Sequence, residues 1–290
     1  LLKEQLRKGN SYPQARSNAL DEYMRTGGTV PCCDWQGILS LPNNILAVEY
    51  LRALLAERSD LIPITIPRLG QGYHQIGNDE FASATAIRNE IENKRPLSEI
   101  KGLPPFTREI LAREFNTGSG PVSSHSLFNL IRYTLSRMST DDLSQIYDVS
   151  EGLENRIHKL APLCGSRDEL ITSVKTRRYS YTRISRILLY ILLNFTKDAA
   201  AIFDTSGPQY LRLLGFSPQG QKILHEMKAI STVPVITKTS KLRYCRYPLL
   251  SRMIAYDFLA TDLHALIQPS PGRGGLDFVR SPVQYGEGPL

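Results

Sequence analysis

The chain has 290 residues, 41% of them hydrophobic, and a formal net charge of +7. This length allows two domains with a sizeable core, and the positive charge favours an anionic partner such as nucleic acid. The four cysteines, Cys32, Cys33, Cys164 and Cys245, have no C-x-x-C spacing, so the sequence suggests neither a zinc site nor a disulfide scaffold. The longest apolar run, residues 187–193, is too short to span a membrane, so we expect a cytoplasmic protein.

The first elements are helical. Residues 1–25 predict two helices that are separated by a break at Gly9, and residues 26–42 predict a loop. A further helix is predicted from residue 44 to about residue 58. Asn43 stands at the start of this helix, where it is either a helix cap that needs no ligand or a ligand-binding side chain.

A strand is predicted next, over residues 62–67. Isoleucines alternate there with Pro63, Thr65 and Pro67, which is strand periodicity with prolines typical of an edge. Arg68 follows at the carboxyl end of this strand. Ligands of open α/β sheets bind at that end, so Arg68 is well placed for a phosphate, although an ordinary loop arginine fits as well.

The segment A-S-A-T-A-I-R, residues 82–88, predicts a helix that is capped by Ser83 and ends before Pro96. The first N–H groups of such a helix lack partners and its dipole end is positive, which favours an anion. Thr85 and Arg88 are three residues apart and share a face, so both can reach one phosphate chain. The alternative is a well-capped helix with a solvated arginine.

Residues 94–105 are rich in proline and charge, and they predict a domain boundary. After it, apolar residues recur three and four apart, which predicts an almost wholly helical region. Ser139 is a good helix start. The helices are expected at residues 106–115, 124–138, 140–147, 152–160, 166–176, 181–195 and 217–228.

The C-terminal region is predicted to contain one strand, residues 233–238, that returns to the sheet of the first domain. The residues from 270 onward predict a loose tail. We therefore expect an α/β region at 1–100, a helical domain at 101–230 and a strand and tail region at 231–290.

Five cations and two tyrosines occur between residues 175 and 186, with no acid among them. Arginine suits phosphates and tyrosine can stack on an unpaired base, so this stretch predicts RNA binding. A solvated basic helix face is the alternative. The residues concerned are Lys175, Arg177, Arg178, Tyr179, Tyr181, Arg183 and Arg186. A second basic patch follows at Lys238, Lys241, Arg243 and Arg246.

Several motifs in colinear order resemble one family. They include L-P-N-N-I-L at 41–46, I-P-R at 66–68, A-S-A-T-A-I-R at 82–88 and Y-L-R-L-L-G at 210–215. The chain is similar to the bacterial tRNA(Met) cytidine acetate ligases, of the nucleotidyltransferase superfamily with its I-S-x-T-x-I-R signature. The resemblance implies a Rossmann-like nucleotidyltransferase α/β domain and a mainly α-helical second domain that binds tRNA.

The resemblance also implies a reaction. ATP, with Mg²⁺, and acetate would give acetyl-adenylate, and the acetyl group would pass to N4 of the wobble cytidine of elongator tRNA(Met). Asn43, Arg68, Ser83, Thr85 and Arg88 are then expected to bind ATP, with Arg88 as the catalytic residue. No residues are assigned as metal ligands.

One family motif, the H-x-G-H turn, is absent from this sequence. We expect that an N-terminal portion carrying it is missing. Two other functions therefore stay open: adenylylation of a small metabolite on the same fold, or tRNA binding without catalysis.

Overall fold

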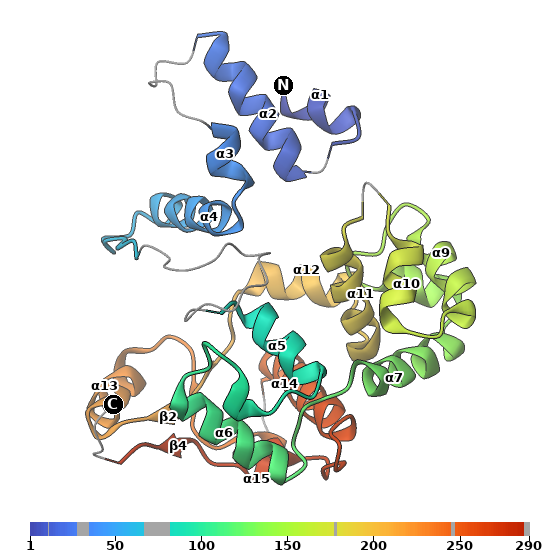
Figure 1. Cartoon of the computed structure of the whole chain (residues 1–290). Coiled ribbons are helices and arrows are strands. Elements are labelled where there is room, and N and C mark those ends of the chain that lie inside the picture. Colours follow the sequence, from blue (N-terminus) through green and yellow to red (C-terminus); the bar gives the residue numbers. More distant parts are fainter. Residues whose placement is uncertain (11, 28–34, 67–81, 177–178, 245–246, 287–290) are drawn as a thin grey trace. The chain divides into compact units, whose positions relative to one another are not determined.

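The computed structural model describes the chain except for residues 11, 28–34, 67–81, 177–178, 245–246 and 287–290 (Figure 1). The chain divides into two compact units. The first unit contains Leu1–Leu69 and Lys175–Ile184, and the second contains Gly70–Val174 and Ser185–Leu290. Each unit has its own set of packed helices.

The described part of the first unit contains helices near the N-terminus, drawn in blue in Figure 1. These helices are α1 (Leu2–Arg7), α2 (Tyr12–Arg25), α3 (Trp35–Ser40) and α4 (Pro42–Ala56). Helix α2 packs against α1 and α3, and α3 packs against α4. Buried apolar side chains of these helices include Ala15 and Ala19 of α2 and Leu39 of α3. The predicted break between the first two helices is confirmed. The prediction of a loop at residues 26–42 is wrong for part of it, because α3 forms there.

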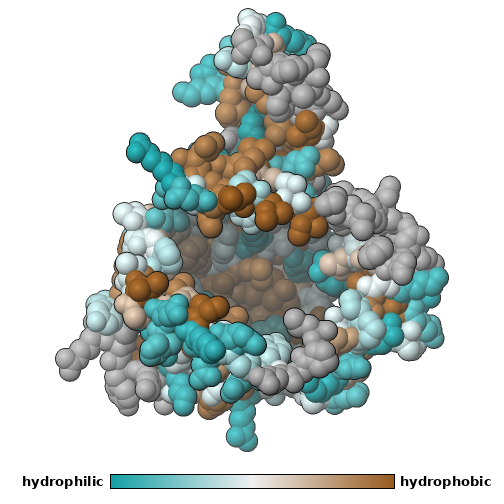
Figure 2. All heavy atoms as spheres, turned by 90° about the vertical axis from the view of Figure 1, so that its left-hand side faces the viewer, coloured by the Kyte–Doolittle hydropathy of each residue, from teal (hydrophilic) through white to brown (hydrophobic). Residues whose placement is uncertain are grey.

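The prediction of a strand at residues 62–67 is wrong for its described part. Residues 61–66 form no strand, and Ile62, Ile64 and Ile66 are 85–89% exposed. Pro63 has no N–H to donate, and the described residues contain no strand that pairs with this segment. Its isoleucines and the apolar side chains of α4 belong to the hydrophobic surface in the upper part of Figure 2.

The second unit begins with a run of helices that follows the predicted order. These helices are α5 (Ala84–Glu92), α6 (Pro105–Asn116), α7 (Ser124–Arg137), α8 (Thr140–Gln145), α9 (Leu153–Leu160), α10 (Arg167–Val174), α11 (Tyr181–Leu193) and α12 (Lys197–Ser206), with short 3-10 helices η1 (Leu97–Glu99) and η2 (Ala161–Leu163). Helix α11 starts within the Lys175–Ile184 segment of the first unit and continues into the second.

The core of this helical part is apolar and well covered. Phe128, Ile131, Leu143, Ile157 and Leu170 are fully buried, and they come from α7, α8, α9 and α10. Helices α8 and α10 both pack against α9, and α7 packs against α10. The apolar spacing of the sequence therefore identifies the buried faces of these helices.

The predicted helix start at Ser139 is confirmed in detail. The Ser139 hydroxyl accepts the N–H of Asp142 at 3.1 Å, and the Asp142 carboxylate accepts the N–H of Ser139 at 2.9 Å. This reciprocal capping satisfies two N–H groups that a helix terminus leaves without partners.

The C-terminal part combines helices with two small parallel pairs of strands. The helices are α13 (Pro218–Ile230), α14 (Pro248–Leu266) and α15 (Leu276–Val279), with a 3-10 helix η3 (Thr239–Tyr244). The strands are β1 (Leu211–Arg212), β2 (Gly215–Phe216), β3 (Val235–Ile236) and β4 (Val283–Gln284); β1 pairs with β3, and β2 pairs with β4. Ile236, Leu250 and Ile254 are the buried core between β3 and α14.

The sequence predictions for this part are correct only in places. The strand near residue 235 exists, but it pairs with Leu211–Arg212. The loose tail is wrong for residues 276–284, since α15 and β4 lie there and Asp277 is buried. Helices α12 and α14 were not predicted. The limits of the three predicted domains stay a prediction.

Candidate functional site

The N-terminus of α5 is the best-defined part of the candidate site. Ser83 has an extended backbone, and its hydroxyl accepts the N–H of Ala86 at 3.1 Å, so the predicted cap is confirmed. The N–H of Ile87 then bonds to the carbonyl of Ser83 at 3.0 Å. The N–H groups of Ala84 and Thr85 come before the first intrahelical bond and have no acceptor within the helix. They are available to an anion.

Thr85 and Arg88 lie on one exposed face of the same helix. The Arg88 Nη2 is 3.5 Å from the Thr85 Oγ1, which is at the long limit of a hydrogen bond. Both side chains are exposed, and no carboxylate among the described residues lies within ion-pair distance of Arg88. An unneutralised guanidinium beside a helix N-terminus gives this face a local positive charge that suits a polyphosphate.

The opposite side of this segment rests on Gly102. A side chain at this position is not tolerated, because an added Cβ would lie 2.5 Å from the nitrogen and 2.8 Å from the Cβ of Ala82. Its φ of +72° is also in the left-handed region that favours glycine. Ile100 and Leu103, on either side of it, are buried. Sequence reasoning missed Gly102, since its close contact with residue 82 is tertiary.

Asn43 lies in the first turn of α4, in the first unit, and its side chain is exposed. Leu41 occupies the N-cap position, with Pro42 as the first helical residue. Neither Asn43 nor Asn44 therefore caps the helix; the Asn44 amide instead donates to the carbonyl of Ile38 at 3.0 Å. Arg68 lies outside the described residues.

The stretch of cations and tyrosines at residues 175–186, called the basic stretch below, is only partly exposed. Tyr179 is 6% exposed, and the guanidinium of Arg183 lies over its ring at 4.7 Å from the centroid. Tyr181, at 39%, is the more exposed tyrosine. Arg186 is exposed and lies 3.9 Å from the carboxylate of Asp148. Lys175 is exposed as well, and Arg177 and Arg178 lie outside the described residues.

Comparison with known proteins identifies the family of this chain. Residues 1–275 match the family model of HIGH nucleotidyl transferases. A tRNA(Met) cytidine acetate ligase from Syntrophomonas wolfei is 42% identical over 289 residues, which is 97% of this chain and 68% of that protein. The one from Thermoanaerobacter sp. is 38% identical, over 96% of this chain and 67% of its own length. The chain belongs to the tRNA(Met) cytidine acetate ligase family.

Solved structures give the same result. Thermotoga maritima TmcAL in its apo form I has a TM-score of 0.88 and 32% identity, over 98% of this chain and 70% of TmcAL. A second crystal structure of TmcAL, bound with alpha-thio ATP, has a TM-score of 0.86 and 33% identity over 98% of this chain and 69% of TmcAL. The predicted nucleotidyltransferase α/β fold with a helix-rich remainder is confirmed, and so is the assignment to a family of ligases.

The family motif Y-L-R-L-L-G lies in a polar network that sequence reasoning did not resolve. The Tyr210 hydroxyl donates to the Asp257 carboxylate at 2.6 Å. Arg212 pairs with Asp277 and lies 3.8 Å from Asp257, and the Thr239 hydroxyl donates to the Asp277 carbonyl. Burial, and then the neighbouring Asp257 carboxylate, raises the pKa of Tyr210 above its ordinary value. The network joins β1 to α14 and α15.

Two general features of the described residues complete the site. They contain no group of three or more His, Cys, Asp or Glu side chains that could hold a metal ion. Within the same residues, every helix is too short or too polar to cross a membrane. The cytoplasmic location stays a prediction.

Proposed function

We propose that this member of the family is an ATP-dependent ligase that activates acetate as acetyl-adenylate and acetylates N4 of the wobble cytidine of elongator tRNA(Met). The observation that carries this proposal is the capped, open N-terminus of α5 with Arg88 beside it. TmcAL, which binds alpha-thio ATP in a crystal structure, is 33% identical over nearly all of this chain, and this supports ATP as the nucleotide.

The proposed chemistry has two steps. A carboxylate oxygen of acetate attacks the α-phosphorus of ATP, and the bond to the β-phosphate breaks, so pyrophosphate leaves with the electron pair. The N4 amine of the cytidine then attacks the acyl carbon. The bond to AMP breaks, and the amine loses a proton to solvent. No protein nucleophile is needed, since positioning and charge neutralisation supply the catalysis.

Each residue of the ATP site has a proposed role. Ser83, Thr85 and the amides between them hold the β- and γ-phosphate oxygens, and Arg88 stabilises the departing pyrophosphate. Asn43 contacts the base or ribose of the nucleotide, and Arg68 contacts a phosphate. Mg²⁺ is proposed to enter with ATP on the phosphate oxygens.

The basic stretch is proposed to bind tRNA. Lys175, Arg177, Arg178, Arg183 and Arg186 contact phosphates, and their charges suit the RNA backbone. Tyr181 has the more accessible ring and stacks on an unpaired base. The ring of Tyr179 is covered by Arg183, so Tyr179 acts by holding that guanidinium in place.

The ATP site is tested by calorimetry at low salt with Mg²⁺. The wild-type chain is expected to bind ATP, and Arg88→Ala is expected to bind it about tenfold to a hundredfold more weakly, because a hydrogen bond to a charged group contributes roughly 1.5–3 kcal/mol. Arg113→Ala is the matched control: Arg113 is an exposed arginine on α6, paired with Glu114 at 3.2 Å. Equal ATP affinities of the two variants, or no binding by the wild type, contradict the proposed site.

The basic residues between 175 and 186 are compatible with a second function, tRNA binding without catalysis, because phosphate contacts need no ATP site. The two functions differ in one readout, the release of pyrophosphate from ATP and acetate by this chain alone. Release that exceeds the rate of an Arg88→Ala sample supports the ligase, and its absence supports the binding protein.

A further inference from the structure

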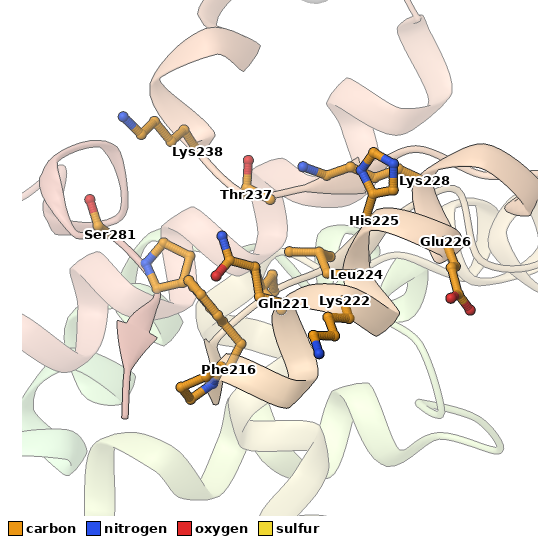
Figure 3. Close-up of a pocket in the computed structure, with 13 residues that line it drawn as sticks. Phe216, Gln221, Lys222, Leu224, His225, Glu226, Lys228, Thr237, Lys238 and Ser281 are labelled. Carbon is orange, nitrogen blue, oxygen red and sulfur yellow. The ribbon is translucent and has the colours of Figure 1, made fainter. Parts of the chain in front are cut away.

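A cavity lies far along the sequence from the α5 site. It has a volume of about 880 Å³ and is lined by α13, by the residues that follow β3 and by those that precede β4 (Figure 3). This volume is within the range of roughly 300–1,000 Å³ that small-ligand sites have. The polar and basic side chains that face one another across it are Gln221, His225, Lys228, Thr237, Lys238 and Ser281.

Helical spacing explains why α13 presents this set of side chains. Gln221, His225 and Lys228 are separated by four and three residues, so they share one face of the helix. Lys222 and Glu226 also border the cavity but belong to another face, and Figure 3 shows both pointing away from the side on which Lys228 and Lys238 lie. The carboxylate of Glu226 therefore does not neutralise that side.

The charge on that side is positive and unpaired. Lys228 and Lys238 are exposed, and neither has a carboxylate partner among the described residues. Figure 3 shows the two lysines on opposite sides of the cavity, with Gln221 and Thr237 between them. The negative C-terminal end of α13 accounts for a lysine at position 228. It does not account for Lys238, which follows β3 on the other side of the cavity.

The remaining lining is apolar. Leu213, Phe216, Leu224 and Pro282 border the cavity, and Leu213, Phe216 and Leu224 are half-buried. A nucleotide has a flat apolar face, a polar edge and a phosphate, and RNA-binding proteins meet these with apolar or aromatic surface, amides or hydroxyls, and cations. All three kinds of group are present here.

We propose that this cavity holds one unpaired nucleotide of the tRNA substrate. Lys228 and Lys238 contact its phosphates, Gln221 and Thr237 contact the edge of its base, and the apolar lining packs against the face of the base. The inference rests on the proposed function, because it takes tRNA to be the substrate. A free mononucleotide offers the same chemistry, and the test separates these two sources.

The test measures binding of an elongator tRNA(Met) transcript to the full chain by fluorescence anisotropy at several salt concentrations. Lys228→Gln and Lys238→Gln are each expected to weaken binding severalfold. Each is also expected to reduce the steepness of the fall of log K with log salt by about one, which is the effect of one lost phosphate contact. Lys159→Gln is the matched control, because Lys159 is an exposed lysine in the last turn of α9, as Lys228 is in α13. The control is expected to leave both the affinity and the slope unchanged.

The outcomes are distinct. If the wild type binds the transcript but both pocket variants behave like Lys159→Gln, the pocket inference is overturned and the proposed function stands. If the wild type does not bind the transcript, the proposed function fails, and the inference fails with it. CMP and AMP are titrated in parallel: binding of either that is lost in Lys228→Gln, with tRNA binding intact, assigns the cavity to a free nucleotide and overturns the RNA assignment.

Discussion

Gly102 lies directly behind the segment that leads into the N-terminus of α5. Its backbone has a left-handed φ of +72°, and the space where a Cβ would lie is filled by the backbone of Ala82. Ala82 precedes the cap Ser83, so anything that displaces Ala82 also moves the cap and the two free N–H groups after it. Gly102 is therefore a positioning residue for the proposed phosphate site.

We expect Gly102→Ala to destabilise the protein in two ways. The left-handed conformation costs a non-glycine residue about 1–2 kcal/mol, and the overlap with Ala82 adds roughly 1–3 kcal/mol. Urea unfolding measures the sum. The variant is also expected to bind ATP more weakly, because displacement of Ala82 moves the Ser83 cap. Calorimetry measures this loss of affinity, which is expected to exceed the loss caused by the larger fraction of unfolded protein.

Gly152→Ala is the control for this prediction. Gly152 also has a left-handed φ, +82°, but an added Cβ there meets nothing within 4 Å. Gly152→Ala is expected to lose only the free energy of unfolding that the left-handed conformation costs, and to leave the affinity for ATP unchanged. If the two variants lose the same free energy of unfolding and the same affinity, Gly102 does not position the site.

The residues of the site differ in how far the sequence alone could predict them. The cap at Ser83 was predictable because it depends on the four residues that follow it. Gly102 was not, because its contact with Ala82 spans twenty residues of chain. Tyr179 and Tyr181 look equivalent in composition, yet Arg183 covers the first and leaves the second more exposed. Composition does not determine which ring faces inward.

At the scale of elements, the polar network around Tyr210 connects β1 to α14. The Tyr210 hydroxyl bonds to Asp257 of α14, and Arg212 of β1 lies near the same carboxylate. Strands β1 and β3 have only two residues each, so their own ladder is short. Side-chain bonds to a long helix therefore add to the backbone ladder and the apolar contacts that hold this strand pair in place.

We expect Tyr210→Phe to destabilise the chain by about 1 kcal/mol at pH 8, since it removes one hydrogen bond and leaves Asp257 short of a donor. The pH dependence is specific. The pKa of Tyr210 is raised in the folded state, so its stabilising contribution is complete below the unfolded value of about 10 and is lost as pH rises above it.

The measurement is the free energy of unfolding of wild type and Tyr210→Phe at pH 8 and pH 10.5. The difference between the two proteins is expected to shrink at the higher pH. Tyr133→Phe is the control, because Tyr133 is 61% exposed and lies on α7, away from the strands. A difference that stays constant between the two pH values would show that Tyr210 titrates normally.

The sequence could not predict which segments pair as strands, and this limited the prediction of the fold. Residues 62–66 have the alternation of a strand, but the described chain offers them no strand partner, and they remain irregular and exposed. Strand β3 pairs with β1 and is buried at Ile236. Alternation predicts which side chains would share a face, whereas a strand forms only where a neighbour accepts its hydrogen bonds.

At the scale of the whole molecule, the net charge of +7 bears on how tRNA binds. A generally basic surface attracts RNA anywhere, and localised contacts attract it at particular residues. Both weaken binding as salt rises, because phosphate contacts release counterions. The two kinds of attraction predict different results when charges are removed. With localised contacts, removing two particular charges changes the salt dependence of tRNA binding more than removing two others, whereas with general attraction the two changes are equal.

We expect the double variant Lys175→Gln, Arg186→Gln to bind tRNA with a salt dependence that is less steep by about two units of the slope of log K against log salt. Its affinity for ATP is expected to stay unchanged. The control is Lys3→Gln combined with Arg113→Gln, which removes the same charge from exposed positions in α1 and α6. Anisotropy titrations from low to moderate salt measure both slopes. The two double variants have the same net charge, so equal slopes would mean that the charge of the whole molecule attracts the RNA. A less steep slope in the first variant alone would assign the contacts to residues 175–186.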